Sequence, residues 1–199
     1  MDYQKIINEV TKQEEMLRFD RFTNDDAWAL GKHLVEKVER DGIKMAISIR
    51  KLNGNCVFAY FSEGTNLMNE NWMRRKYNTV KYNEMSSFKQ WAIHTWKGRT
   101  PEDTGLKSED FAFCGGGFPI KLKSGEMVAV LTVSNLPHEK SVSMDLTPIL
   151  YFLYICFRFA LYLKFNSATL KPIDFLQYSF VICSFFCWNF KCIHSLLCI

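Results

Sequence analysis

Residues 44–61, KMAISIRKLNGNCVFAYF, decide the fold class of this chain. In the first part of the stretch Met45, Ile47 and Ile49 recur at a spacing of two, which predicts a β-strand with one apolar face. Asn53-Gly54 follows, and Asn-Gly between two alternating runs is a strong signal for a hairpin turn. The stretch therefore predicts an antiparallel pair of strands.

Two helices are expected before this hairpin. Residues 3–17 carry apolar side chains at helical spacing, with acids and lysines between them. In residues 23–42, Thr23 is placed to cap a helix, Asp26 to complete a capping box, and Gly42 to end the helix. Both segments therefore predict amphipathic helices.

Helices and strand pairs continue to alternate along the chain after this hairpin. One helix is expected over about 68–81, where no Gly or Pro interrupts the chain, and another begins at Ser86 or Ser87. Residues 111–134, FAFCGGGFPIKLKSGEMVAVLTVS, predict two more strands joined by a Ser-Gly turn. Hairpins interleaved with helices predict an α+β fold, in which a central antiparallel sheet is flanked by helices that cover one of its faces.

The overall composition is that of a globular protein. The 199 residues are 48% hydrophobic and 15% aromatic, enough for a buried core. The net charge of +4 is smaller than the concentrated basic excess of nucleic-acid binders, so we expect no nucleic-acid partner. The first residues lack the apolar run of a signal peptide, and the cysteines lack metal-site spacing. We therefore expect a cytoplasmic protein with reduced cysteines and no bound metal.

The composition also divides the chain into a predicted domain, residues 1–140, and an atypical hydrophobic tail, residues 141–199. Of the last 54 residues, 14 are aromatic and none is Gly. A membrane anchor is one interpretation of the tail. However, Arg158 interrupts the apolar run 149–163, which is shorter than the roughly 20 residues of a spanning helix. We favour a tail translated from noncoding sequence, and we expect no membrane partner.

Three consecutive glycines, Gly115–Gly117, precede Phe118. Glycine permits positive φ angles and a close approach of the backbone to a ligand. The run is therefore either part of a ligand site or a bulge at the start of a strand, and it lacks the spacing of a phosphate loop. Cys114 and His138 are the candidates for a catalytic role. A catalytic thiol needs a nearby base, and the sequence leaves open which histidine approaches Cys114.

A basic block lies in residues 69–87, NENWMRRKYNTVKYNEMSS, where Arg74, Arg75 and Lys76 follow Trp72. On a helix, three consecutive side chains spread over about 200°, so these three cannot all face one ligand. In one interpretation the charges are solvated and Trp72 packs on the sheet. In the other, one arginine pairs with a carboxylate of a ligand, and we favour Arg75 for this role.

Four stretches together resemble the haem-degrading-domain proteins, which are relatives of GlcG-type proteins, and in particular their small, poorly characterised cytosolic branch. The stretches are RFTNDDAWALGKHLVE, ISIRKLNGNCVFAYFSEGT, NENWMRRKYNTVKYNEMSS, and CGGGFPI with VAVLTVSNLP, in the family's order over roughly residues 14–140. The resemblance implies a profilin-like or α-β-α layered fold, assembly as a homo-oligomer, and haem or a related tetrapyrrole as a ligand.

The resemblance also implies a set of ligand-binding positions. They are Asn69, Trp72, Arg74, Arg75, Lys76, Ser86, Ser87, Gly115, Gly116, Gly117 and Phe118. This chain departs from the family pattern at Cys114, where relatives often have His. It departs again after Leu136-Pro137, where an Asp-His pair and a closing helix do not follow. The second departure coincides with the change in composition and predicts an uncovered sheet surface.

Three functions are compatible with these features. The first is a cytosolic domain that binds haem or another small anionic molecule, with Arg75 paired to a carboxylate and the glycine run against the ring. The second is an enzyme in which Arg75 positions a small anionic substrate while Cys114 or His138 transfers protons. The third is a non-catalytic component of a homo-oligomer. We favour the first, because the sequence shows no complete catalytic set.

Overall fold

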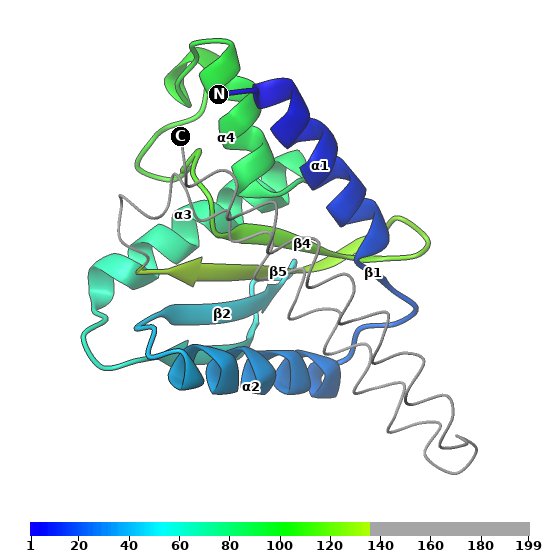
Figure 1. Cartoon of the computed structure of the whole chain (residues 1–199), viewed down its shortest axis with the longest axis vertical. Coiled ribbons are helices and arrows are strands. Elements are labelled where there is room, and N and C mark those ends of the chain that lie inside the picture. Colours follow the sequence, from blue (N-terminus) through cyan, green and yellow to red (C-terminus); the bar gives the residue numbers. More distant parts are fainter. Residues whose placement is uncertain (136–199) are drawn as a thin grey trace, which may run out of the picture. The chain divides into compact units, whose positions relative to one another are not determined.

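The computed structural model describes residues 1–135 and places a five-stranded sheet between helices (Figure 1). The strand order is β1-β4-β5-β2-β3. The strands are β1 (Arg18–Phe19), β2 (Ala46–Lys51), β3 (Cys56–Phe61), β4 (Gly117–Leu122) and β5 (Met127–Ser134). The pairs β2–β3, β2–β5 and β4–β5 are antiparallel, which confirms the predicted sheet. The sequence prediction missed β1, which pairs in parallel with β4, because two residues show no alternation.

The predicted helices are also confirmed. They are α1 (Tyr3–Met16), α2 (Asn24–Arg40), α3 (Leu67–Asn83) and α4 (Ser87–Trp96), followed by the short 3-10 helix η1 (Glu102–Thr104) in the polar loop. The capping box of α2 forms as expected: the Asp26 backbone N–H donates to Thr23 Oγ1 at 3.2 Å, and the Thr23 N–H donates to Asp26 Oδ2 at 2.8 Å. Gly42, with φ of +65°, follows its end.

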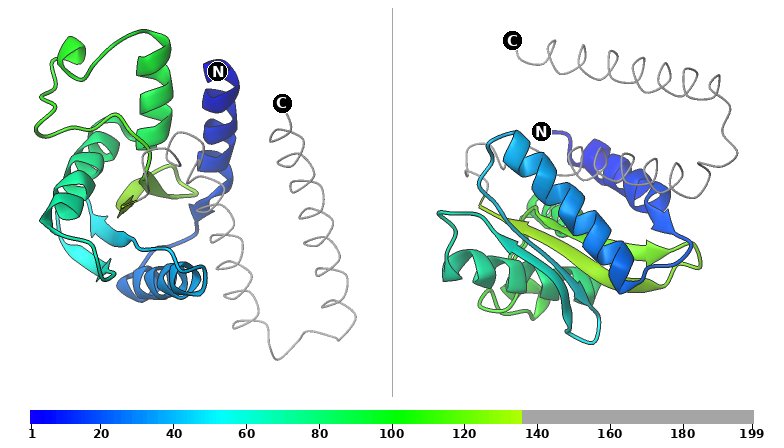
Figure 2. Two further views of the ribbon diagram at one scale, coloured as in Figure 1. Left: turned by 60° about the vertical axis from the view of Figure 1, so that its left-hand side comes forward. Right: turned by 90° about the horizontal axis from the view of Figure 1, so that it is seen from below.

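Helices cover both faces of the sheet, so the prediction that they cover one face is wrong (Figure 2). Helix α2 packs on β2 and β3, whereas α3 packs on β5, β4 and β2 from the other side, and α4 packs beside α3 against β4. Helix α1 packs against α4. The second covered face could not be recognised from the sequence of β2. The β2 residues on that face are Ala46 and Ser48, which are small or polar yet buried.

The α2 face is packed closely at one glycine. A Cβ atom added to Gly31 would lie 2.4 Å from the Phe58 ring, so the helix backbone lies directly on the side chain of β3. The Phe58 ring also meets Trp28 edge-on, with 5.9 Å between ring centroids. On the α3 face, Ser48 and Thr132 share a buried hydroxyl hydrogen bond of 2.8 Å between β2 and β5.

Within residues 1–135, no helix has the length and apolar character needed to cross a membrane. The predicted domain boundary at residue 140 and the hydrophobic tail, residues 141–199, lie outside the described residues.

Candidate functional site

The three consecutive cations of α3 have three different surroundings. Arg74 lies at the surface, where its guanidinium pairs with Asp110 at 2.8 Å and donates to the Glu109 carbonyl at 2.7 Å. It therefore ties α3 to the loop that follows η1. Because this guanidinium already has a carboxylate partner, Arg74 is a weaker ligand-binding candidate than its neighbour Arg75.

Arg75 lies over the half-buried Trp72 ring, with 4.3 Å from its guanidinium carbon to the ring centroid. One terminal nitrogen donates to the Phe111 carbonyl at 3.2 Å. Its Nε is buried and has no hydrogen-bond partner within residues 1–135. Trp72 therefore holds the Arg75 guanidinium in place, and the Nε–H of this guanidinium has no acceptor within residues 1–135. An oriented guanidinium with an unpartnered N–H is suited to binding an anion.

Lys76 points inward from α3. It is buried, its Nζ donates to the Val133 carbonyl of β5 at 2.9 Å, and no carboxylate of residues 1–135 forms an ion pair with it. Burial lowers the pKa of Lys76, Cys114 acts to raise it, and the Arg75 cation lowers it further. A buried ammonium group without a counter-ion is costly, so this position favours an anionic ligand.

Cys114 is partly buried close to these cations. Burial raises the pKa of its thiol, whereas Lys76 and Arg75 act to lower it. His94 is occupied elsewhere, because its ring stacks on Phe113 at 4.3 Å between centroids and its Nε2 is 2.8 Å from Gln90 Nε2. Within the described residues, the charged groups that act on the pKa of Cys114 are the Lys76 ammonium and the Arg75 guanidinium. The other histidine candidate, His138, lies outside the described residues.

Cys114 is expected to react with iodoacetamide more slowly than the exposed Cys56 near pH 8, because burial favours its neutral thiol. In the Lys76→Met variant the reaction of Cys114 should require a still higher pH, since one cation that stabilises the thiolate has been removed. Peptide mass spectrometry of the alkylated full chain measures both rates. Equal rates at Cys56 and Cys114 in the native chain would contradict the described surroundings.

The three glycines of the run differ in why a larger residue would be unfavourable at each position. Gly116 has φ of +106°, where other residues are strained, and its carbonyl accepts from the Val133 N–H at 2.8 Å. Gly117 packs so closely that an added Cβ would lie 2.8 Å from Val80 Cγ2 and 2.9 Å from Ser87 Oγ. Gly115 is less crowded, since its Cβ would lie 3.4 Å from the nearest atom of Phe88.

Hydroxyl and amide side chains of α3 and α4 fix the backbone that leads into the glycine run. Thr79 Oγ1 accepts from the Ala112 N–H at 3.0 Å and donates to the Ala112 carbonyl at 3.1 Å. Asn78 donates to the Asp110 carbonyl at 2.9 Å. The Gly117 N–H donates to Ser87 Oγ at 2.8 Å. The two helices therefore hold the whole segment against the sheet.

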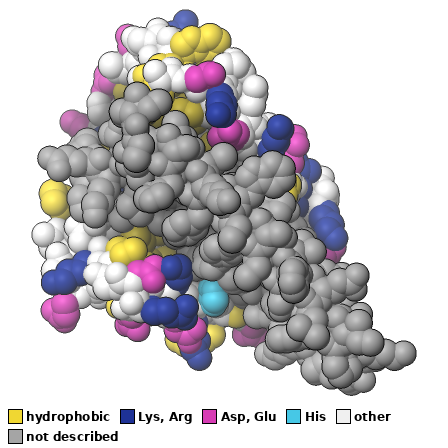
Figure 3. Space-filling model, viewed as in Figure 1, with side chains coloured by type: hydrophobic (Ala, Val, Ile, Leu, Met, Phe, Trp, Pro, Cys, Tyr) yellow, Lys and Arg dark blue, Asp and Glu magenta, His cyan; other side chains and the backbone are white. Residues whose placement is uncertain are grey.

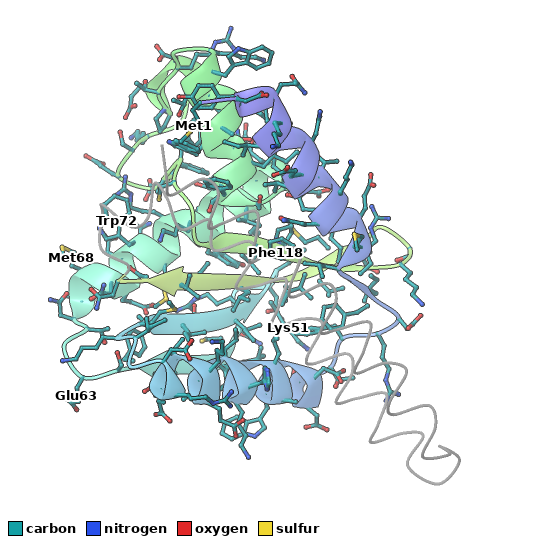
Figure 4. The ribbon with its side chains drawn as sticks, in the orientation of Figure 1. Met1, Lys51, Glu63, Met68, Trp72 and Phe118 are labelled. Carbon is teal, nitrogen blue, oxygen red and sulfur yellow. The ribbon has the colours of Figure 1, made fainter. Side chains whose placement is uncertain are left out.

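Other predicted positions have different structural roles. Asn69 completes the capping box of α3 and donates to Ser134 Oγ at 3.3 Å. Ser86 caps α4, and its backbone N–H donates to the buried Glu14 at 2.7 Å. Figure 4 shows Trp72 on α3 well apart from Phe118 on β4. Because side chains alternate along a strand, Phe118 faces away from α3.

The structure thus brings the inner part of α3 beside the segment that ends in the glycine run. The residues there are Trp72, Arg75, Lys76, Cys114 and Gly116, whereas Gly115 lies nearest to Phe88 of α4. The sequence prediction listed Lys76 among the ligand-binding positions but favoured Arg75, and it did not foresee that Lys76 is the buried cation, although a signal was present. Met73, Tyr77 and Val80 form the buried stripe of α3 at helical spacing, and Lys76 falls within this stripe. Within residues 1–135, no three His, Cys, Asp or Glu side chains are grouped to hold a metal ion.

Comparison with known proteins found one matching family model and several similar proteins. The family model for "Haem degrading protein HbpS-like" matches residues 22–144. UPF0303 protein YE1367 of Yersinia enterocolitica is 31% identical over 139 residues, 69% of this chain and 82% of the relative. UPF0303 protein RL3365 of Rhizobium johnstonii is 37% identical over 133 residues, 67% of this chain and 82% of the relative.

Solved structures show the same fold. The Ybr137w protein superposes with a TM-score of 0.66 at 28% identity, covering 76% of this chain and 87% of that protein. HbpS gives a TM-score of 0.52 at 19% identity, covering 68% and 89%. The complex of PduOC with heme gives 0.52 at 16% identity, covering 65% and 94%.

Proposed function

The chain belongs to the HbpS-like family of haem-degrading proteins, and from this premise we propose that it binds haem or a related small anionic molecule beside helix α3. The observation that carries the proposal is the buried Lys76 ammonium, which has no carboxylate partner within residues 1–135. An anionic ligand would supply the missing counter-charge. That PduOC was solved as a complex with heme supports haem as the first ligand to test.

The residues of the candidate site fit the chemistry of haem. Its two propionates are carboxylates, for which Arg75 and Lys76 offer an unpartnered guanidinium nitrogen and a buried ammonium group. Its flat ring requires backbone without bulky side chains and an aromatic surface. Gly115 and Gly116 provide the first, and Trp72 provides the second. Bound haem iron would supply redox chemistry that protein side chains lack.

Titration of ferric haem into the full chain tests this proposal. We expect a shifted haem absorption band, and we expect the Arg75→Ala variant to bind about 10-fold or more weakly, because a charge-assisted hydrogen bond is lost. Arg74→Ala is the matched control. It removes the same charge from the neighbouring position, but Arg74 is already paired with Asp110, so the affinity should change little.

Two results would count against the proposal. One is the absence of a band shift in the wild-type chain. The other is an equal loss of affinity in the Arg74→Ala and Arg75→Ala variants, which would indicate a general charge effect. Repeating the titration with iron-free protoporphyrin separates recognition of the carboxylates from binding through iron.

A second candidate function is catalysis on a small anionic substrate. The proximity of Lys76 to Cys114 favours it, since each group shifts the other's pKa toward its charged form. In this proposal Arg75 positions the substrate while the thiol and the amine exchange a proton. Turnover of a substrate by the wild-type chain, and its loss in the Cys114→Ala variant, would distinguish this function from binding alone.

We also propose that the protein is cytoplasmic and assembles as a homo-oligomer. Leu67 and Met68 at the start of α3 are 83% and 62% exposed, and Phe61 at the end of β3 is also exposed. Figure 3 shows hydrophobic surface at this end of the molecule, where Figure 4 labels Met68. Exposed apolar groups of this kind are typical of contact surfaces between subunits. Light scattering of the full chain measures the subunit number.

A further inference from the structure

Strand β3 forms one edge of the sheet, since it comes last in the order β1-β4-β5-β2-β3. The Ser62 N–H, just after β3, donates to the Met45 carbonyl, just before β2, at 3.2 Å. In an antiparallel ladder alternate residues direct their backbone groups to the same side, so Tyr60 also faces β2. The N–H and C=O groups of Ala59 and Phe61 therefore face the open edge. Within the described part of the chain, no strand pairs with them there.

The open edge of β3 is weakly protected against pairing with another strand. Proteins usually protect an edge with charged side chains, Pro, a bulge or a covering segment. The sequence of β3, CVFAYF, contains no charged residue and no Pro. It does contain a bulge at Val57, which has no partner in the register of β3 with β2. The regular part of the edge therefore begins at Phe58.

Apolar side chains are exposed on both faces of the sheet beside this edge. On one face Trp28 of α2 is 63% exposed, although its ring meets the Phe58 ring edge-on. Side chains alternate along a strand, so Ala59 and Phe61 lie on the other face. Both are exposed, because the helix on that face, α3, packs on β5, β4 and β2. A strand added at this edge would bury apolar side chains as well as backbone groups.

We propose that β3 pairs in antiparallel orientation with β3 of a second copy of this chain, so that two sheets join into one. This inference rests on the proposed homo-oligomer and identifies one of its interfaces. The regular edge runs from Phe58 to Ser62, so a two-fold axis that uses all of it passes beside the middle residue, Tyr60. Ala59 of each copy then lies opposite Phe61 of the other, and each such pair exchanges two backbone hydrogen bonds.

The side chains of β3 favour a second copy over an unrelated peptide. In this register the exposed Phe61 ring of each copy lies beside the small Ala59 of the other, which leaves room for the ring. The two Tyr60 side chains lie opposite each other, and aromatic cross-strand pairs stabilise a sheet. The strand carries no charge that would select a charged peptide. The same surface of each copy is used, as a closed two-fold dimer requires.

Disulfide trapping of the Tyr60→Cys variant of the full chain tests this register. Facing residues of a pair that is not hydrogen-bonded have Cα atoms about 4.5 Å apart, within the range that a disulfide spans. Mild oxidation should therefore link two copies through the introduced cysteines. The native Cys56 is the internal control, because it is exposed on the same strand. The two Cys56 residues would lie roughly 26 Å apart, so peptide mass spectrometry should find no link between them.

A pair of charge variants tests the same interface without cross-linking. The Ala59→Lys, Phe61→Lys double variant places like charges opposite each other and should raise the dissociation constant of the dimer by about 10-fold or more. The Ala59→Glu, Phe61→Glu double variant should do the same, and mixing the two variants should restore the dimer. Because both side chains are exposed, urea unfolding of the separated chains should change little. Light scattering at a series of protein concentrations measures the assembly.

The outcomes separate this inference from the proposed homo-oligomer. If the wild-type chain and both charge variants assemble equally well, the homo-oligomer uses another surface and the pairing through β3 is wrong. A link between the introduced cysteines that is no more frequent than the link between two Cys56 residues would also overturn the pairing. A wild-type chain that stays monomeric at all concentrations would overturn both proposals.

Discussion

Replacing Lys76 by Met is expected to weaken haem binding at least about 10-fold while the protein stays as stable as the wild type or becomes more stable. The affinity falls because the variant lacks the buried ammonium group that attracts a carboxylate. The stability is kept because Met has a similar length and no charge to bury, and replacing a buried charge by an apolar group of similar volume is often neutral or stabilising. The variant gives up one hydrogen bond to the Val133 carbonyl.

Haem titration and urea unfolding of the same preparations measure the two effects. Lys81→Met is the matched control, because Lys81 lies on the same helix but is exposed and donates to the Leu52 carbonyl. It should change neither quantity appreciably. If Lys76→Met instead lowers the stability and leaves the haem affinity unchanged, Lys76 serves the fold and the proposed site is wrong.

The pH dependence of the Lys76 effect has a defined sign. Burial lowers the pKa of Lys76 below its ordinary value of 10.5, so its charge is lost at a lower pH than that of an exposed lysine. Haem binding should weaken as the pH rises through this lowered pKa, and the Lys76→Met variant should lack this step. Between the lowered pKa and 10.5 the unfolded chain binds more protons than the folded chain. The stability contribution of Lys76 therefore rises with pH in that window and is lost as the pH falls through it.

The helices could be predicted from the sequence because their ends are defined by local chemistry. Thr23 and Asp26 satisfy free N–H groups of α2 within four residues of chain, so no distant partner is needed. The same holds for Ser86 at the start of α4 and for the Asn53-Gly54 turn between β2 and β3. These elements are fixed by neighbours in sequence.

The missed features depend on distant contacts. Strand β1 exists because its two residues meet Lys121 and Leu122 more than a hundred positions later. The second helical layer follows from the burial of Ala46 and Ser48, which neither size nor polarity predicts. The residue pattern of one segment does not indicate which distant segment of the chain packs against it.

The sequence pattern indicated two segments that the structure brings together, but not the surroundings of each cation, and the binding role of these residues stays a prediction. The block on α3 and the glycine run do meet, and Arg75 does keep an unpartnered nitrogen. Which cation is buried depends on the rotation of α3 against β5, and this rotation places Lys76 inward. Helical spacing of Met73 and Val80 indicates that orientation, since Lys76 lies between them on the buried stripe.

Substituting Gly117 by Ala is expected to lower the free energy of unfolding by about 1–3 kcal/mol, the usual cost of overpacking a core. The added methyl group would lie 2.8 Å from Val80 Cγ2 and 2.9 Å from Ser87 Oγ, and both side chains are fully buried. Relief of the contact would move Ser87 away from the Gly117 N–H, leaving a buried donor without its partner. Urea unfolding of the full chain measures the loss.

Gly115→Ala is the control that separates packing from ligand recognition. Its methyl group would make an ordinary contact with Phe88 at 3.4 Å, and its φ is not in the left-handed region, so the stability should change by less than about 0.5 kcal/mol. If the glycine run approaches the haem ring, Gly115→Ala should nevertheless weaken haem binding, because a methyl group occupies the space that the ring needs. A variant with unchanged stability and unchanged haem affinity would limit the glycine run to its structural role at Gly116 and Gly117. In that case the ligand would contact only the α3 side of the site, through Arg75 and Lys76.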